Sequence, residues 1–153
     1  MYKSQSIPLL FCTLLITGCA SVAMESTEKS NQAKKFNNPP ANSAGLYVYR
    51  KGQIAPQSKK DIILNGECLG ESANNTFFYK EVTAPASHVI ATESEFSPNV
   101  IEIYVEAGKN YFIKQFIKIG LFVPGAGLAL VDEDTGKNAV TKISLAKSGN
   151  CSK

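Results

Sequence analysis

Val100-Ile101-Glu102-Ile103-Tyr104-Val105-Glu106 is the stretch of sequence that decides the fold. In an extended chain its isoleucine and valine side chains alternate with glutamate and tyrosine, so one face is apolar and the other is polar. A period of two is typical of a β-strand that buries one face and exposes the other to water. The stretch therefore predicts a half-buried strand of an antiparallel sheet.

A second apolar segment, residues 111–119, follows the turn residues 107–110, and we expect the two segments to form a hairpin. Isoleucines would line its inner face, whereas Phe112 and Phe116 would share the outer face with two lysines. The next loop, residues 120–127, is also apolar and either fills the end of the domain, which we favour, or forms an exposed patch. Phe112, Phe116 and Phe122 are therefore the candidate contacts for a protein partner.

Further short apolar runs are separated by turn residues, and we expect strands over residues 46–49, 61–64, 66–68, 76–82, 88–93 and 128–131. Asn65-Gly66 is the strongest two-residue hairpin signal in the chain. Residues 138–146 fit either a strand or one short C-terminal helix. The pattern predicts an all-β fold, an antiparallel two-sheet sandwich of the immunoglobulin-like or prealbumin-like kind, with a small open barrel as the alternative.

The N-terminal residues 1–18 have the layout of a secretory signal, with one lysine followed by a short apolar segment. Ile16-Thr17-Gly18-Cys19 resembles the lipobox of bacterial lipoproteins. That resemblance implies cleavage between Gly18 and Cys19 and lipidation of Cys19, and the alternative is an ordinary signal peptide that contains a cysteine. Ala20-Ser21, which lacks an aspartate, resembles the type sorted to the outer membrane. We expect a lipid anchor on its periplasmic face.

Residues 19–43 are rich in Ser, Asn, Lys and Pro and show neither helical nor strand periodicity. We expect a lipidated N-terminus and a flexible tether here, because such a segment buries too little apolar surface to offset its chain entropy. The alternative is that part of the segment packs as a strand or short helix. Residues 44–153 then form the β-sandwich domain.

The chain has four cysteines. Signal cleavage would remove Cys12 and lipid would occupy Cys19, which leaves Cys68 and Cys151 in an oxidising compartment. We expect these two to form a disulfide. A metal pair would lack further ligands, and a free redox thiol would lack a Cys-x-x-Cys spacing.

Catalytic chemistry has little support in the sequence. His88 is the one histidine, and we expect it at the surface or at a strand start. The glycines of residues 120–127 lack the Gly-Lys-Ser/Thr ending of a phosphate loop. Residues 132–136 are better explained as a charged turn than as a calcium loop, and Glu93 and Glu95 as a strand end entering a turn. We expect no enzyme activity, no cofactor, no metal and no nucleic-acid binding.

Four stretches resemble one known family. They are residues 44–50 (AGLYVYR), 92–99 (TESEFSPN), 108–118 (GKNYFIKQFIK) and 145–151 (LAKSGNC). The resemblance is to domain-of-unknown-function family 2846, small Gram-negative proteins that are often lipoproteins, and it covers residues 44–151. It implies a β-rich sandwich but supplies no activity, substrate or catalytic residue. Residues 122–126 depart from the glycine pair of the family.

The leading functional hypothesis is an outer-membrane-anchored periplasmic lipoprotein that acts as a non-enzymatic binding or structural module of the cell envelope. Its partners would be the membrane, through the N-terminal lipid, and an envelope protein. One alternative is a small periplasmic enzyme or small-ligand carrier that uses the Glu93/Glu95 region or a pocket under residues 120–127. A second alternative is an accessory lipoprotein of a secretion or immunity system.

Overall fold

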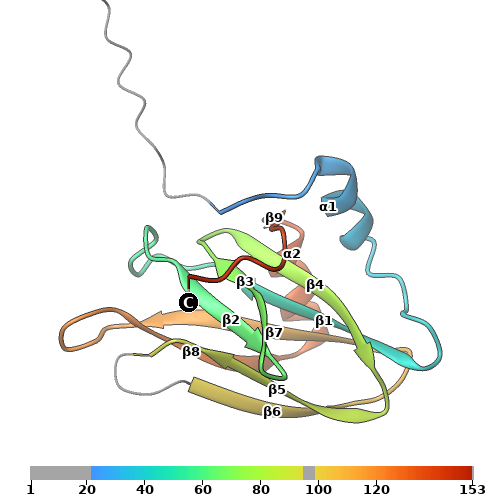
Figure 1. The fold of residues 1–153 in the computed structure, drawn as a ribbon. Coiled ribbons are helices and arrows are strands. Elements are labelled where there is room, and N and C mark those ends of the chain that lie inside the picture. The colour runs from blue at the N-terminus through green and yellow to red at the C-terminus, as the bar shows by residue number, and fades with distance from the viewer. Residues whose placement is uncertain (1–21, 95–98, 153) are drawn as a thin grey trace, which may run out of the picture.

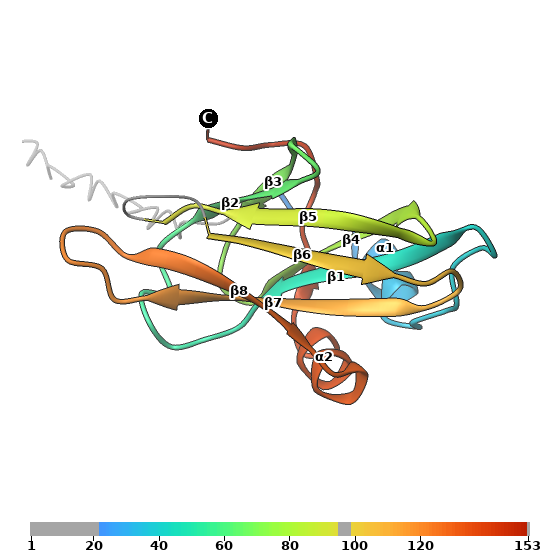
Figure 2. The same ribbon diagram turned by 90° about the horizontal axis from the view of Figure 1, so that it is seen from below.

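Two β-sheets packed face to face form the body of the protein in a computed structural model that describes residues 22–94 and 99–152 (Figure 1). The elements in chain order are α1 (Thr27–Ala33), β1 (Ser43–Arg50), β2 (Lys60–Leu64), β3 (Glu67–Ser72), β4 (Thr76–Thr83), β5 (Ala86–Thr92), β6 (Asn99–Val105), β7 (Asn110–Lys118), β8 (Gly125–Val131), α2 (Glu133–Val140) and β9 (Ser144–Leu145). Figure 2 shows the two layers edge-on, with α2 on the far side of the sheet that contains β1 and β7. The two-sheet sandwich predicted from the sequence is confirmed.

One sheet has the strand order β8-β7-β1-β4-β9 and the other β3-β2-β5-β6. Most neighbouring strands are antiparallel, but β1 runs parallel to β7 and β4 runs parallel to β9. The predicted hairpin between residues 100–106 and 111–119 is wrong, because β6 and β7 lie in different sheets. The turn between them carries the chain across the sandwich, and Gly108 N donates to Ser43 O at 2.8 Å to fix the crossing against β1.

Apolar residues are buried on both faces of the five-stranded sheet. The inner face meets the second sheet in a core that includes Leu46, Val48, Ile62, Phe78, Ile90, Ile103, Val105 and Ile113. The outer face carries a second cluster made of Tyr47, Tyr49, Phe77, Phe112, Val140 and Ile143. This double burial explains why β1 is buried along nearly its whole length and why its sequence does not alternate between apolar and polar residues.

The segment before β1 differs from the predicted flexible tether. From Val22 onward it lies against the domain: Glu25 N donates to Leu145 O at 2.9 Å, and α1 begins at the N-cap Ser26. Phe36 covers the outer cluster, with its ring centroid 5.4 Å from that of Tyr47. The alternative of a short packed helix is therefore the one the structure shows. Periodicity missed it because the segment is attached by backbone hydrogen bonds and a few scattered apolar side chains, Val22, Met24 and Phe36 among them, rather than by an apolar stripe.

Helix α2 replaces the predicted charged turn at residues 132–136. Asp132 is its N-cap, and its carboxylate accepts a hydrogen bond from Thr135 N at 2.8 Å. Residues 138–146 contain both predicted alternatives, since they hold the end of α2 and the short strand β9. The carboxylates that the sequence analysis assigned to a turn thus begin a helix that covers the outer cluster.

Candidate functional site

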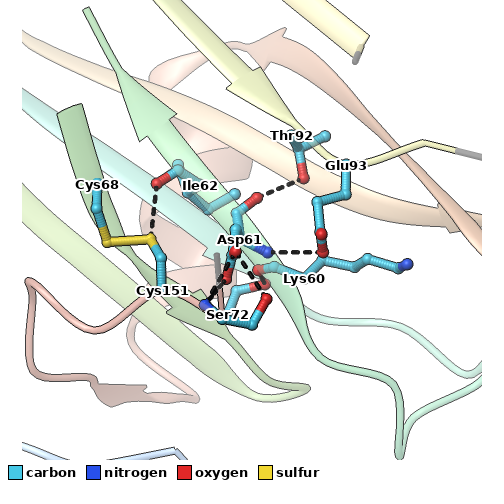
Figure 3. Close-up of a disulfide and its surroundings, with 9 residues drawn as sticks. Lys60, Asp61, Ile62, Cys68, Ser72, Thr92, Glu93 and Cys151 are labelled. Carbon is cyan, nitrogen blue, oxygen red and sulfur yellow. Dashed lines mark hydrogen bonds between the residues drawn. A yellow bond between two sulfur atoms is a disulfide. The ribbon is translucent and has the colours of Figure 1, made fainter. Parts of the chain in front are cut away.

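The predicted pairing of Cys68 with Cys151 is present as a disulfide, with the two Sγ atoms 2.03 Å apart. It fastens the C-terminal segment to the edge of the four-stranded sheet (Figure 3). Backbone hydrogen bonds accompany it, including Glu71 N to Asn150 O at 2.7 Å. The buried carboxylate of Asp61 also accepts from Ser152 N at 3.0 Å. The segment is therefore held by polar contacts on both sides of the covalent link.

The motif for lipid attachment, Gly18 and Cys19, lies outside the described residues. In the part of the chain that the structure describes, no helix is both long enough and apolar enough to cross a bilayer. The lipid anchor therefore stays a prediction from the sequence.

The three phenylalanines predicted to contact a partner differ in how far their side chains are exposed. Phe112 is 1% exposed in the outer cluster, so its assignment as a partner contact is wrong. It is covered by α2 and by Phe36, whose ring centroid lies 5.8 Å away. Phe116, on the same face of β7 but beyond the helices, is 36% exposed, and Phe122 is 81% exposed. Two of the three residues are thus exposed at the surface.

Phe122 belongs to an apolar loop between β7 and β8, which we define as residues 119–123. Ile119, Leu121 and Val123 are also largely exposed, so the expectation that residues 120–127 fill the end of the domain is wrong for this loop, although Gly125, Ala126 and Gly127 are buried in β8. Figure 1 shows it as an orange loop that projects beyond the sheet. Lys118 flanks it, with Nζ 5.6 Å from the ring centroid of Phe116. The loop and these two residues form a surface with apolar and basic character.

The side chains of His88 and Glu93 form hydrogen bonds that hold neighbouring segments of the fold together. His88 lies near the start of β5, as expected, but its side chain is buried rather than exposed. The Nε2 atom of His88 lies 2.8 Å from Thr83 O, and its Nδ1 atom lies 2.8 Å from the side-chain nitrogen Nδ2 of Asn65. Glu93 accepts a hydrogen bond from Asp61 N at 3.3 Å, while Glu95 lies outside the described residues. The imidazole therefore joins β5 to the turn that precedes β3.

A polar network occupies one end of the space between the sheets. The amide of Gln115 accepts from Ser72 Oγ and donates to Thr92 Oγ1 at 2.7 Å. Thr92 Oγ1 donates in turn to Asp61 O at 2.8 Å. The side chains of Gln115, Ser72 and Thr92 are almost completely buried, so the network is a polar link between β7 and the four-stranded sheet.

Arg50 ends β1 beside this network and is 3% exposed. It is hydrogen-bonded to two carbonyl oxygens of the following loop, Ser58 O at 2.5 Å and Ala55 O at 3.0 Å. Burial lowers the pKa of the guanidinium. Arg50 was not among the residues expected from the sequence. Its burial could have been predicted from its position, because it follows Leu46 and Val48 at a spacing of two and therefore lies on the same inner face of β1.

Two cavities open on the surface near these elements. The first, about 170 Å³, is lined by Arg50, Lys51, Gly52, Gln53, Ile54, Lys114, Gln115, Phe116 and Ile117.

The second, about 300 Å³, lies between α1 and the outer face of the five-stranded sheet and includes Tyr47, Tyr79 and Glu81. Burial, followed by the Glu81 charge, raises the pKa of Tyr79 to about 12, and burial also raises that of Tyr47. Both phenols therefore stay protonated near neutral pH, and Tyr47 donates to Ala33 O at 2.8 Å to hold α1 in place.

Comparison with known proteins places this fold in a family. The family described as "Protein of unknown function (DUF2846)" matches residues 40–126, a shorter range than the resemblance predicted. An uncharacterized protein of Haemophilus influenzae is 47% identical over 135 residues, which cover 88% of this chain and 80% of the relative. The match includes β1 to β7 and both sheets of the sandwich. The chain therefore belongs to the DUF2846 family.

Proposed function

We propose that the protein is a non-enzymatic binding module of the Gram-negative cell envelope, anchored by lipid on Cys19 at the periplasmic face of the outer membrane. The lipobox-like residues 16–19 support the anchor. The Cys68–Cys151 disulfide is consistent with an oxidising compartment, since such bonds persist outside the cytosol. Three acyl chains would hold the domain at a membrane durably, because one chain alone binds only marginally.

The observation that carries the binding role is the exposed apolar loop, residues 119–123. Phe122 is 81% exposed and Ile119 is 87% exposed. Contiguous exposed apolar side chains often mark a surface that contacts another molecule. Lys118 and the half-exposed ring of Phe116 lie beside the loop. The partner is an envelope protein that presents an apolar patch bordered by acidic residues.

The anchor is tested by labelling cells with radioactive palmitate. The wild-type chain and Cys12→Ala should both incorporate label, because Cys12 precedes the cleavage site, whereas Cys19→Ala should incorporate none and accumulate as precursor. Equal labelling of Cys19→Ala, or no labelling of the wild type, would exclude lipid on Cys19.

The contact surface is tested by affinity capture from detergent-solubilised envelopes with Phe122→Ser and Tyr104→Ser. Tyr104 is the matched control, because it is 63% exposed on β6 of the other sheet. A stoichiometric partner should be recovered by the wild type and by Tyr104→Ser and lost with Phe122→Ser. Recovery that is the same for both variants would remove the apolar loop from the interface.

A further inference from the structure

The guanidinium of Arg50 is a buried positive charge without a carboxylate partner among the described residues. Its two hydrogen bonds go to neutral carbonyl oxygens, Ala55 O and Ser58 O. A guanidinium has five N–H donors, so these contacts leave donors available. A buried ion is costly unless a counter-charge compensates it. The structure thus holds a cation whose natural complement, an anion, is not supplied by this part of the chain.

The acidic groups of the neighbouring strands are committed to other partners. Glu71 forms an ion pair with Lys59 at 3.2 Å. The carboxylate of Asp61 accepts from Ser152, and Glu93 accepts from Asp61 N. Gln115 does not substitute for an acid, since both ends of its amide are engaged within the polar network. The chain itself does not neutralise Arg50 by any of these routes.

The described residues that line the cavity next to Arg50 include three cations and no acidic residue. Lys51 and Lys114 border the same space of about 170 Å³, together with the apolar side chains of Ile54 and Phe116. Lys51 is exposed and Lys114 is half-buried, whereas Arg50 lies deeper. The volume suits one small group rather than a large ligand. Hydrogen bonds hold part of its wall, since Arg50 donates to the loop carbonyls and Gly52 N donates to Asn74 Oδ1 at 3.0 Å.

We propose that this cavity binds the anionic oxygen group of a small ligand, a phosphate or a carboxylate, with Arg50 at its base and Lys51 and Lys114 at its mouth. The planar fork of a guanidinium matches two oxygens of either group, and charge-assisted hydrogen bonds of this kind are about twice as strong as neutral ones. The adjoining side chains of Ile54 and Phe116 contact the apolar part of the ligand. The site adjoins the contact surface through Phe116, but it contains no residue of the loop 119–123 and does not depend on the lipid anchor.

The test is an NMR titration of the ¹⁵N-labelled full-length chain in detergent micelles, with sodium phosphate and sodium acetate added separately at constant ionic strength. We expect saturable shifts of the backbone amides of residues 52–54 and 115–117. Lys114→Glu should weaken binding by about tenfold or more, the effect of losing one charge-assisted hydrogen bond. Lys142→Glu is the matched control: Lys142 is exposed after α2, away from the cavity, and its reversal changes the net charge equally.

The two probes distinguish the ligand classes. Saturation by phosphate that Lys114→Glu weakens and Lys142→Glu leaves within about twofold assigns a phosphate site. The same pattern with acetate alone assigns a carboxylate site. Absence of saturation by both probes, or equal effects of the two lysine variants, overturns the proposal and leaves Arg50 as a clamp for residues 51–58. Arg50→Lys adds a second readout, because it keeps the charge but loses the fork and should weaken binding while the wild-type circular dichroism spectrum is retained.

Discussion

Replacing Phe112 by alanine should destabilise the fold strongly, although the sequence pattern assigns this side chain to the protein surface. Its ring is 1% exposed and stacks on Tyr47, with centroids 4.9 Å apart. Removal of a fully buried phenylalanine costs about 3–5 kcal/mol, from lost apolar burial and the cavity that remains. The ring also touches Phe36 and lies under Gly136 of α2. We therefore expect a loss of about 4 kcal/mol in the free energy of unfolding.

The measurement is urea unfolding followed by circular dichroism, with Phe116→Ala as the matched control. Phe116 is the same residue type on the same face of β7, but it is 36% exposed and lies beyond the helices. Its loss should cost about 1 kcal/mol. If Phe112→Ala cost no more than Phe116→Ala, the outer face of the sheet would not be a buried core, and the packing of the N-terminal segment and α2 described above would be incorrect.

Three further predictions concern the disulfide and α2. Cys151→Ser should lower the free energy of unfolding by up to about 4.6 kcal/mol, since the bond closes a loop of 83 residues; urea unfolding that matches the wild type would contradict this. A backbone N–H lowers the pKa of Asp132 below its ordinary value of 3.8, so its carboxylate stabilises the fold above that pH and the contribution is lost as pH falls through the lower folded value. The melting temperature of the wild type relative to Asp132→Asn should therefore fall as the pH is lowered through and below 3.8, and a constant difference would refute it. Gly136→Ala should destabilise by about 1–3 kcal/mol, because the new Cβ would lie 2.2 Å from Phe112 Cγ. Gly52→Ala, which meets nothing within 4 Å, is the control, and equal unfolding curves would contradict the contact.

Most strands were predictable because each has a short apolar run bounded by turn residues, and the Asn65-Gly66 turn does join β2 to β3. The placement of β6 and β7 in different sheets was not predictable in the same way. Residues 106–109 reverse the chain equally well within a sheet or between sheets. The choice depends on β1, whose parallel pairing with β7 is a contact between segments far apart in sequence.

The faces of β7 show why the candidate site was only partly predictable. Phe112 and Phe116 lie on the same face with the same spacing to lysines, yet one is buried and the other is half-exposed. The difference is that α2 and the segment around Phe36 cover Phe112 but not Phe116. Neither segment has enough apolar residues for its packing on the sheet to be predicted from the sequence. Phe122 could be named as a contact candidate from its apolar neighbours, but its exposure follows from the length by which the loop extends beyond the sheet.

The central claim is that a lipid-anchored domain contacts an envelope protein through the apolar loop, and photocrosslinking in living cells tests it most directly. A photoreactive phenylalanine analogue would replace Phe122, or Tyr104 as the control on the other sheet, in the full chain with and without Cys19→Ala. We expect one discrete crosslinked protein from position 122, none from position 104, and a loss of the product when Cys19 is replaced. Equal products from both positions, or a product from position 122 that is unchanged by Cys19→Ala, would contradict it.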